Sequence, residues 1–415
     1  MGWRDRTAVA ENPNTTVEVL RRLAMDDDWR VRVSVARNTN APAEALEKLA
    51  TDENEYVRRA VAHNKNTPAN TLTKLAMNED WRVRWEVAEN PNAPTEALKR
   101  LASDEDLGIR GAVANHINTP GESLTALADE TTWYVRRDVA ENPNTPTGVL
   151  ARLAMDETMG IRYMVAKNPN TPAEALDRLA TDEGWPVRQE VARNPNTPSG
   201  ALMSLATSEE WEFRQSVAGN PSAPGETLVV LATDKYLDVR KTVARNPSAP
   251  SEVLAGLATD KYSDVRLAVA GNPNTPADVL NKLATDEDKY VRWAVAENTN
   301  ASAEALVVLA SDENRHIRRE TAKNTNSPAD VLNKLATDED VNVRLAVAGN
   351  INVIESILLM AYRDRSPSVR EAVARNPKIP TEAAINLSTS KVLRIRRALS
   401  ENPAVPEHIR VGLSL

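Results

Sequence analysis

Residues 275–298 read TPADVLNKLATDEDKYVRWAVAEN, and this stretch holds one complete unit of a repeat that runs along the chain. Its second half, V-R-x-x-V-A-x-N, recurs at a fixed interval of 26 residues. Sixteen copies of the central arginine keep this phase, so sixteen units account for essentially all 415 residues. No linker or second domain fits between the copies. The spacing predicts a single repeat domain over residues 1–415.

Each unit is interpreted as two helices joined by a turn. Residues 275–278 (T-P-A-D) have the pattern of an N-cap threonine, a proline at the first helical position and an acid in the first turn. The first helix is expected to run to residue 284, and Thr285 is expected to cap a second helix over 286–297. Asn298 ends it and can adopt the left-handed conformation there. Such short helix pairs cannot bury their apolar faces alone, so they are expected to stack as an α-solenoid.

The full motif, V-R-x-x-V-A-x-N-P-N-T-P…L-x-x-L-A-x-D, resembles the leucine-rich repeat variant family, bacterial relatives of the HEAT and armadillo solenoids. The resemblance covers the whole chain. It implies an all-α fold, an α-solenoid with a right-handed superhelix of sixteen 26-residue two-helix repeats, in which the first helix of each repeat can be partly 3₁₀. The family's founding type resembles an iron–sulfur protein with a cysteine cluster ahead of its repeats. This chain has no cysteine, so no cluster is carried over.

Composition and missing motifs exclude several functions. Zero cysteine excludes a disulfide scaffold and a thiolate metal site. The four histidines, His63, His116, His316 and His408, fall in different repeats and give no metal-ligand spacing. There is no H-E-x-x-H, P-loop, G-x-G-x-x-G or nucleophile elbow. We therefore predict no catalytic residue, no metal and no cofactor, and expect a protein that is not an enzyme.

The charge and the apolar segments bear on partners and location. With 51 Lys and Arg against 59 Asp and Glu, the net charge of −8 argues against a nonspecific polyanion binder. The first residues lack the apolar core of a secretory signal, and the most apolar stretch, residues 351–360, is too short to span a bilayer. We expect a cytoplasmic protein with no membrane partner.

One arginine occupies the middle of the face of the second helix that stays nearly constant between repeats. It could belong to a ladder that binds a polyanion, since the guanidinium fork suits phosphate. Alternatively it is structural and bonds loop carbonyls or an aspartate, with the partner expected in an adjacent repeat. Its presence in every copy, flanked by apolar residues, favours the structural interpretation. The candidate arginines are Arg32, Arg58, Arg84, Arg110, Arg136, Arg162, Arg188, Arg214, Arg240, Arg266, Arg292, Arg318, Arg344 and Arg370.

The tryptophans are also placed in phase with the repeat. Six lie three residues before the arginine and two directly follow it; the eight are Trp3, Trp29, Trp81, Trp133, Trp185, Trp211, Trp85 and Trp293. Either each indole covers the seam between repeats, or the indoles form an aromatic stripe that anchors a partner. The position that these six tryptophans share holds Ser263 and Lys289 in other repeats, so it does not lie deep in the core.

Residues 351–367 depart most from the repeat and are more apolar. They are either a packing variant that grades into a C-terminal capping region ending at 415, or an exposed apolar patch for a partner or for self-association. Elsewhere, the varied face of the second helix carries basic and acidic residues in nearly equal number. A mixed face of this kind suits a protein partner better than a phosphate backbone.

These observations predict a non-enzymatic repeat scaffold that binds another protein along one face, with the eight tryptophans as candidate contacts. The first alternative is binding of nucleic acid or another polyanion in an arginine-lined groove. The second is a structural spacer or assembly element. Neither the partner's identity nor its pathway follows from the sequence.

Overall fold

The computed structural model describes residues 2–413, and there each repeat forms one long and one short helix. All regular secondary structure within those residues is helical, and corresponding helices begin 26 residues apart, as α21 (Ser263–Gly271) and α23 (Lys289–Glu297) do. This confirms the predicted all-α repeat fold. Contacts divide the chain into two compact units, residues 1–204 and 205–415.

The first unit alternates nine-residue and seven-residue helices. Its long helices are α1 (Trp3–Glu11), α3 (Trp29–Arg37), α5 (Glu55–His63), α7 (Trp81–Glu89), α9 (Leu107–Asn115), α11 (Trp133–Glu141), α13 (Met159–Lys167) and α15 (Trp185–Arg193). Its short helices are α2 (Val17–Leu23), α4 (Ala43–Leu49), α6 (Ala69–Leu75), α8 (Thr95–Leu101), α10 (Gly121–Leu127), α12 (Thr147–Leu153) and α14 (Ala173–Leu179), and the unit boundary falls within α16 (Ser199–Ala206).

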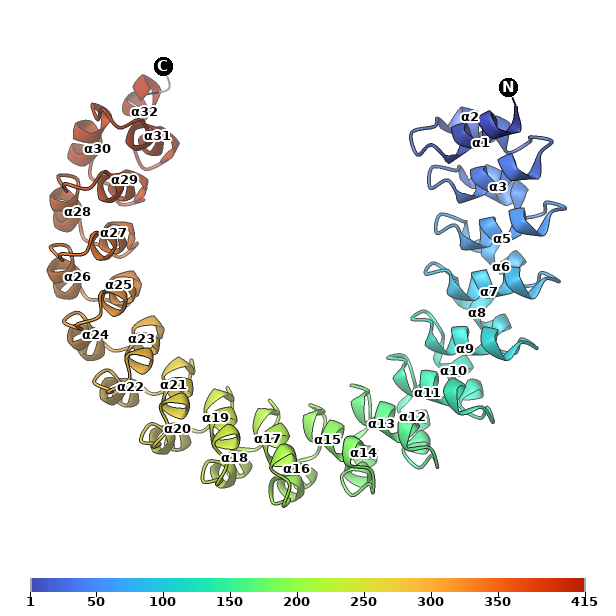
Figure 1. The fold of residues 1–415 in the computed structure, drawn as a ribbon, viewed down its shortest axis with the longest axis horizontal. Helices are drawn as coiled ribbons and strands as arrows, with labels where there is room; N and C mark the ends of the chain where they lie inside the picture. Colours follow the sequence, from blue (N-terminus) through green and yellow to red (C-terminus); the bar gives the residue numbers. More distant parts are fainter. Residues whose placement is uncertain (1, 414–415) are drawn as a thin grey trace. The chain divides into compact units, whose positions relative to one another are not determined.

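The second unit repeats the pattern. Besides α21 and α23, its long helices are α17 (Trp211–Gly219), α19 (Leu237–Arg245), α25 (Arg315–Lys323), α27 (Val341–Gly349), α29 (Pro367–Arg375) and α31 (Leu393–Glu401). Its short helices are α18 (Gly225–Leu231), α20 (Ser251–Leu257), α22 (Ala277–Leu283), α24 (Ala303–Leu309), α26 (Ala329–Leu335), α28 (Glu355–Ala361), α30 (Thr381–Ser388) and α32 (Glu407–Leu413). From α18 to α30, the short helices lie on one side of the stack and the long helices on the other (Figure 1).

The helix boundaries differ from those predicted. Pro276, not Thr275, is the N-cap of α22, and the Thr275 hydroxyl donates instead to the carbonyl oxygen of Val269 at 2.6 Å. The long helix α23 begins at residue 289, since Asp288 caps it by accepting from the backbone N–H of Tyr290 at 2.8 Å. Asn298 is extended, with φ −68° and ψ 127°, not left-handed. In most repeats a proline follows this asparagine and disfavours helical backbone there.

The core of each repeat joins both helix types. In the repeat of α22 and α23, Leu280 and Leu283 of the short helix are 0% and 2% exposed, and Val291 and Val295 of the long helix are both 0% exposed. Within each unit, consecutive long helices pack directly on one another. Each repeat therefore buries its apolar face only when a neighbour covers it, which is how a solenoid is stabilised.

The asparagine that ends each long helix bonds back to the preceding repeat. Asn168 donates from Nδ2 to the carbonyl oxygens of Ala140 and Asn142, at 2.8 and 3.0 Å, and its Oδ1 accepts from the N–H of Asn170 at 2.9 Å. The same clamp recurs at residues such as Asn64, Asn272 and Asn376. The side chain satisfies carbonyls that the helix ends leave free, so this asparagine has a structural role.

Candidate interaction surface

The arginine of each repeat bridges to the repeat that follows. Arg32 donates from Nε to Oδ2 of Asp52 at 2.6 Å and from Nη2 to Oδ1 at 2.9 Å. Its Nη1 donates to the carbonyl oxygens of Asp26 and Asp27, at 2.8 and 3.1 Å. The side chains of Arg32 and Asp52 are 11% and 8% exposed. Four hydrogen bonds thus fix the guanidinium between two repeats, and two of them form a bidentate ion pair.

This ion pair forms where an aspartate follows the arginine by 20 residues. The pairs are Arg6–Asp26, Arg32–Asp52, Arg84–Asp104, Arg136–Asp156 and Arg162–Asp182 in the first unit, and Arg214–Asp234, Arg240–Asp260, Arg266–Asp286, Arg292–Asp312, Arg318–Asp338 and Arg344–Asp364 in the second. We call this set the Arg–Asp ladder.

Hydrogen bonding in the Arg–Asp ladder favours the charged forms of Arg32 and Asp26. The hydrogen bond to Asp52 raises the pKa of Arg32, and the hydrogen bond from Arg6 lowers the pKa of Asp26. The carboxylate partner lies in the adjacent repeat, as the structural interpretation expected. The N–H donors of the paired guanidinium groups already bond to aspartates and loop carbonyls of the protein, which disfavours a polyanion as their ligand.

Four arginines have a residue other than aspartate at the partner position: Arg58, Arg110, Arg188 and Arg370. Asn78 stands 20 residues after Arg58, and the buried Nε of Arg58 has no hydrogen-bond partner among the described residues. Glu130 replaces the aspartate opposite Arg110 and still forms an ion pair: its Oε1 lies 2.7 Å from Nε, which makes no hydrogen bond, and its Oε2 accepts from Nη2 at 3.3 Å. Ser390 stands opposite Arg370 in the register.

Ser208 stands 20 residues after Arg188, and this arginine keeps the bonds to its own loop. Its Nη1 donates to the carbonyl oxygens of Asp182 and Glu183.

The six in-phase tryptophans begin the long helices and lie at the surface. Trp3, Trp81, Trp133 and Trp185 are 39%, 45%, 51% and 40% exposed, and Trp29 and Trp211 are half-buried. Sequence analysis missed that tyrosines one residue to either side continue the row where tryptophan is absent. Tyr56, Tyr236, Tyr262 and Tyr290 are 53%, 41%, 44% and 60% exposed. We call these ten side chains the aromatic row.

Contacts within the aromatic row join neighbouring repeats. Trp29 stacks on Tyr56 with ring centroids 5.4 Å apart, and Trp211 stacks on Tyr236 at 5.7 Å. Arg30 lies over the rings of both Trp3 and Trp29, at 5.0 and 4.9 Å. The rings therefore cover seams between repeats and also attract cations, so the two interpretations of this position are compatible.

Acidic side chains lie beside the aromatic row in the first unit. Glu53, Glu79, Glu105 and Glu183 each lie next to the ladder position, two residues before the start of a long helix, and their side chains are 91%, 90%, 87% and 90% exposed. We call these four residues the acidic rim. It places negative charge beside the exposed rings of α5, α7 and α15, and at the start of α9, which begins with Leu107 instead of a ring.

Trp85 and Trp293, which follow the ladder arginine, are half-buried. Trp85 packs against the next repeat: a Cβ atom added to Gly108 would lie 2.8 Å from its Cζ3 atom. This tryptophan covers the seam between α7 and α9, and a glycine at residue 108 makes room for it.

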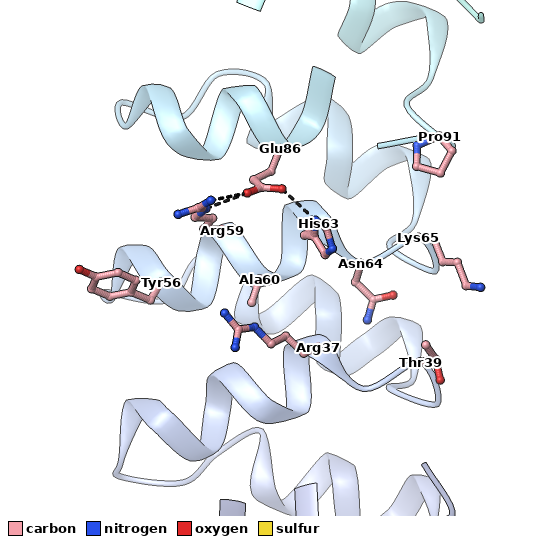
Figure 2. A pocket seen from close by; sticks show the side chains of 10 residues that line it. All are labelled: Arg37, Thr39, Tyr56, Arg59, Ala60, His63, Asn64, Lys65, Glu86 and Pro91. Carbon is pink, nitrogen blue, oxygen red and sulfur yellow. Dashed lines mark hydrogen bonds and ion pairs between the residues drawn. The ribbon is translucent and has the colours of Figure 1, made fainter. Parts of the chain in front are cut away.

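A hollow of about 700 Å³ opens between α3, α5 and α7 in the first unit. In Figure 2, Arg59 and His63 turn toward Glu86, and their contacts to its carboxylate measure 2.7 and 2.9 Å. Arg37 and Lys65 line the same hollow. This cluster was not predicted, because His63 was weighed as a metal ligand and not as a partner for a carboxylate. The signal in the sequence was that the varied face carries Arg59 and His63 in one repeat and the oppositely charged Glu86 in the next.

Residues 351–367 show both predicted properties. Val353, Ile357 and Leu358 are 1%, 1% and 0% exposed and replace core residues of the ordinary repeat. Ile351 and Ile354, in contrast, are 54% and 42% exposed. That this patch mediates self-association stays a prediction.

Other functional classes find no support in the described chain. Across residues 2–413, no group of three or more His, Asp or Glu side chains is arranged to hold a metal ion. None of the helices in this range has the length and apolar character that a membrane span requires.

The stacked helix pairs define the chain as an α-solenoid repeat protein. More particularly, six segments match the family model described as leucine rich repeat variant: residues 29–54, 81–106, 133–157, 160–184, 237–261 and 264–288. The chain carries leucine-rich repeat variant repeats, as its motif predicted.

Solved structures of other helical repeat proteins resemble parts or all of the chain. A structure described as a leucine-rich repeat variant with a novel repetitive protein structural motif is 28% identical, with a TM-score of 0.41 over 53% of this chain and 87% of that one. A crystal structure of importin beta is 12% identical, with a TM-score of 0.40 over 99% of this chain and 74% of that one. No curated protein matches the chain.

Proposed function

We propose that this protein is a non-enzymatic cytoplasmic scaffold that binds another protein along the N-terminal ends of its long helices. The observation that carries the proposal is that, in ten repeats, a ring at or one residue from the start of the long helix lies at the surface. Tryptophan and tyrosine are enriched at the energetic centres of protein interfaces. Their regular recurrence gives a partner several equivalent anchoring points.

The charges beside the row indicate the chemistry of the partner. In the first unit the acidic rim offers carboxylates, and the rings already bind arginine through cation–π contacts. Both features favour lysine and arginine side chains on the partner. We therefore propose a basic, extended protein segment as the occupant of this edge in the first unit.

The same features weigh against the two alternatives. A polyanion would meet the acidic rim and find the ladder arginines already paired. A pure spacer does not require exposed aromatic rings, and exposed apolar surface favours aggregation. These two functions are therefore outcomes of the test rather than further proposals.

The test compares two variants of the full chain. One replaces Trp3, Trp81, Trp133 and Trp185 with alanine. The matched control replaces Met25, Met77 and Met155 with alanine, because these methionines are 65%, 55% and 58% exposed but lie two residues after the ends of short helices instead of beginning long ones.

Proteins captured from host lysate at about 0.15 M salt after nuclease treatment are identified and then titrated individually against wild type and both variants. We expect a captured protein to bind through a Lys/Arg-rich segment, and its affinity to fall at least about tenfold for the tryptophan variant, or about 1.4 kcal/mol, but not for the methionine control. Equal affinity for both variants would contradict the proposed surface. Nucleic acid retained without nuclease and lost at higher salt would favour the polyanion function. Unchanged affinity for the captured protein after deletion of one 26-residue repeat would favour the spacer function.

A further inference from the structure

The Arg–Asp ladder changes its chemistry near α31. Twenty residues after Arg370 the sequence has Ser390 where eleven other repeats have the paired aspartate. The next residue is Lys391, at the position that carries glutamate in many repeats, such as Glu339. Two acids of the ordinary repeat are thus replaced together, one by a neutral residue and one by a cation.

The preceding repeat shows what the aspartate normally does. Asp364 accepts from Nε of Arg344 at 2.7 Å and from Nη2 at 3.3 Å. Its Oδ1 also accepts from the backbone N–H of Ser366 at 2.7 Å, which shapes the turn before α29. The carboxylate therefore has two tasks, one within its own turn and one toward the previous repeat.

Ser390 makes the hydrogen bond within its own turn but does not bind the arginine of the previous repeat. Its Oγ accepts from the backbone N–H of Val392 at 3.2 Å, so the turn before α31 is preserved. A serine has a single oxygen on a shorter side chain, and it cannot supply the pair of oxygens that the guanidinium binds elsewhere.

Arg370 is nevertheless anchored like the other ladder arginines. Its Nη1 donates to the carbonyl oxygens of Asp364 and Arg365, as Nη1 of Arg344 donates to Asp338 and Glu339. Within residues 2–413 its Nε and Nη2 make no hydrogen bond or ion pair. The two donors that bind a carboxylate in the other repeats are left available beside Ser390.

The local charge distinguishes this gap from the one at Arg58. There Asn78 also replaces the aspartate, but Glu79 places Oε1 3.7 Å from Nη2 of Arg58, so a further anion would be repelled. At Arg370 the corresponding residue is Lys391, which would attract one.

We propose that Arg370, Ser390 and Lys391 form a site for an oxyanion with two oxygens that can bond a guanidinium side-on, a carboxylate or a phosphate group. The bound anion takes the place that the aspartate carboxylate occupies in the other repeats. Its charge preference is opposite to that of the acidic rim, so the site goes beyond the proposed function and does not depend on it.

The test uses the full chain with ¹⁵N-labelled arginine and follows the Nε–H signals by NMR. The signal of Arg370 is assigned from the variant Arg370→Lys. Inorganic phosphate and acetate are titrated separately, against potassium chloride at matched ionic strength. The key variant is Ser390→Asp, which builds the missing carboxylate into the chain and restores an arrangement already present in eleven repeats. Thr389→Asp is the matched control, since it adds the same charge one residue away at an exposed position.

We expect phosphate, acetate or both to shift the Arg370 signal in wild type and in Thr389→Asp, and affinity to fall at least about tenfold in Ser390→Asp. Lys391→Glu should weaken binding in the same direction. A stronger response to phosphate identifies a phosphoryl ligand, and a stronger response to acetate identifies a carboxylate. A response to neither anion beyond the chloride control, or equal weakening by both aspartate variants, would overturn the proposal.

Discussion

Replacing Asn78 with aspartate should stabilise the first unit, because it completes the Arg–Asp ladder at a point where the ladder is broken. The Nε of Arg58 is buried without a hydrogen-bond partner, whereas Arg84 in the next repeat bonds Asp104 at 2.6 and 3.0 Å. Asn78 already makes the turn contact of a ladder aspartate, since its Oδ1 accepts from the N–H of Asp80 at 3.1 Å. The substitution therefore needs no change of backbone.

The magnitude follows from the neighbouring pair. The side chains of Arg84 and Asp104 are 10% and 6% exposed, so the pair is neither a solvated surface pair nor fully sealed from water. A charge-assisted hydrogen bond contributes about 1.5–3 kcal/mol, and desolvation of the new carboxylate offsets part of the two that form. The flanking acids add no new penalty, because Glu105 and Asp106 flank Asp104 in the same way. We expect a gain of about 2 kcal/mol, close to a 30-fold change in the local opening equilibrium.

Native-state hydrogen exchange is the suitable assay, since stability in a solenoid is a sum of repeat and neighbour terms. Amides of α5 and α7 should be protected more strongly in Asn78→Asp, while those of α13 should change little. The reciprocal control Asp104→Asn removes one complete pair and should reduce protection in α7 and α9 by a similar amount. Unchanged or weaker protection of α5 and α7 in Asn78→Asp would refute the reasoning, as would an Asp104→Asn variant as stable as wild type.

Other consequences of the fold can be measured in the same way. His116, which replaces the clamp asparagine, makes one bond of 2.9 Å to the carbonyl oxygen of Asn90, so His116→Asn should restore the second bond and add about 1 kcal/mol, and a lower urea midpoint would contradict this. Leu254→Ala removes a side chain that is 0% exposed and should cost about 2–5 kcal/mol in urea unfolding, a loss that an exposed site such as Ile385→Ala should not show. Because the pKa of Asp26 is lowered in the folded protein, its pairing with Arg6 stabilises fully above the unfolded value near about 4 and is lost as the pH falls through the lower folded value. The other lowered aspartates, including Asp234 and Asp364, act alike, so urea midpoints should decline steeply below about pH 4, and midpoints that stay flat to about pH 2 would count against the ladder.

The repeat spacing was enough to predict the helix pairs, and it favoured a structural arginine with a partner in an adjacent repeat over a polyanion site. Period, leucine positions and turn residues all recur, so errors in one copy are corrected by the others. The helix boundaries were wrong by one to three residues for a physical reason. Residues such as Asp286 and Thr275 have the chemistry of helix caps, but Asp286 accepts from Arg266 and Thr275 bonds Val269. Which of several compatible partners a polar side chain chooses depends on the neighbouring repeat.

The candidate surface was predicted only in part. The regular spacing of the tryptophans was visible in the sequence. The tyrosines at 56, 236, 262 and 290 lie one residue away from that position, yet a ring there can still reach its neighbour, as Tyr56 does in stacking on Trp29. The cluster of Arg59, His63 and Glu86 needs contacts from the repeat of α5 to that of α7, between residues 23 and 27 apart. That residues 1–415 act as one domain stays a prediction.

The way the Arg–Asp ladder and the asparagine clamp connect neighbours has a mechanical consequence. Both sets of bonds join a repeat to the one beside it, so tension on the two ends of a unit would load these joints in series. A repeat that yields releases 26 residues, or about 90 Å of extended chain. When each unit is stretched in a single-molecule force experiment, its length should increase in a series of small, nearly equal steps. The joint at Arg58, which lacks its aspartate, should be among the first to give way.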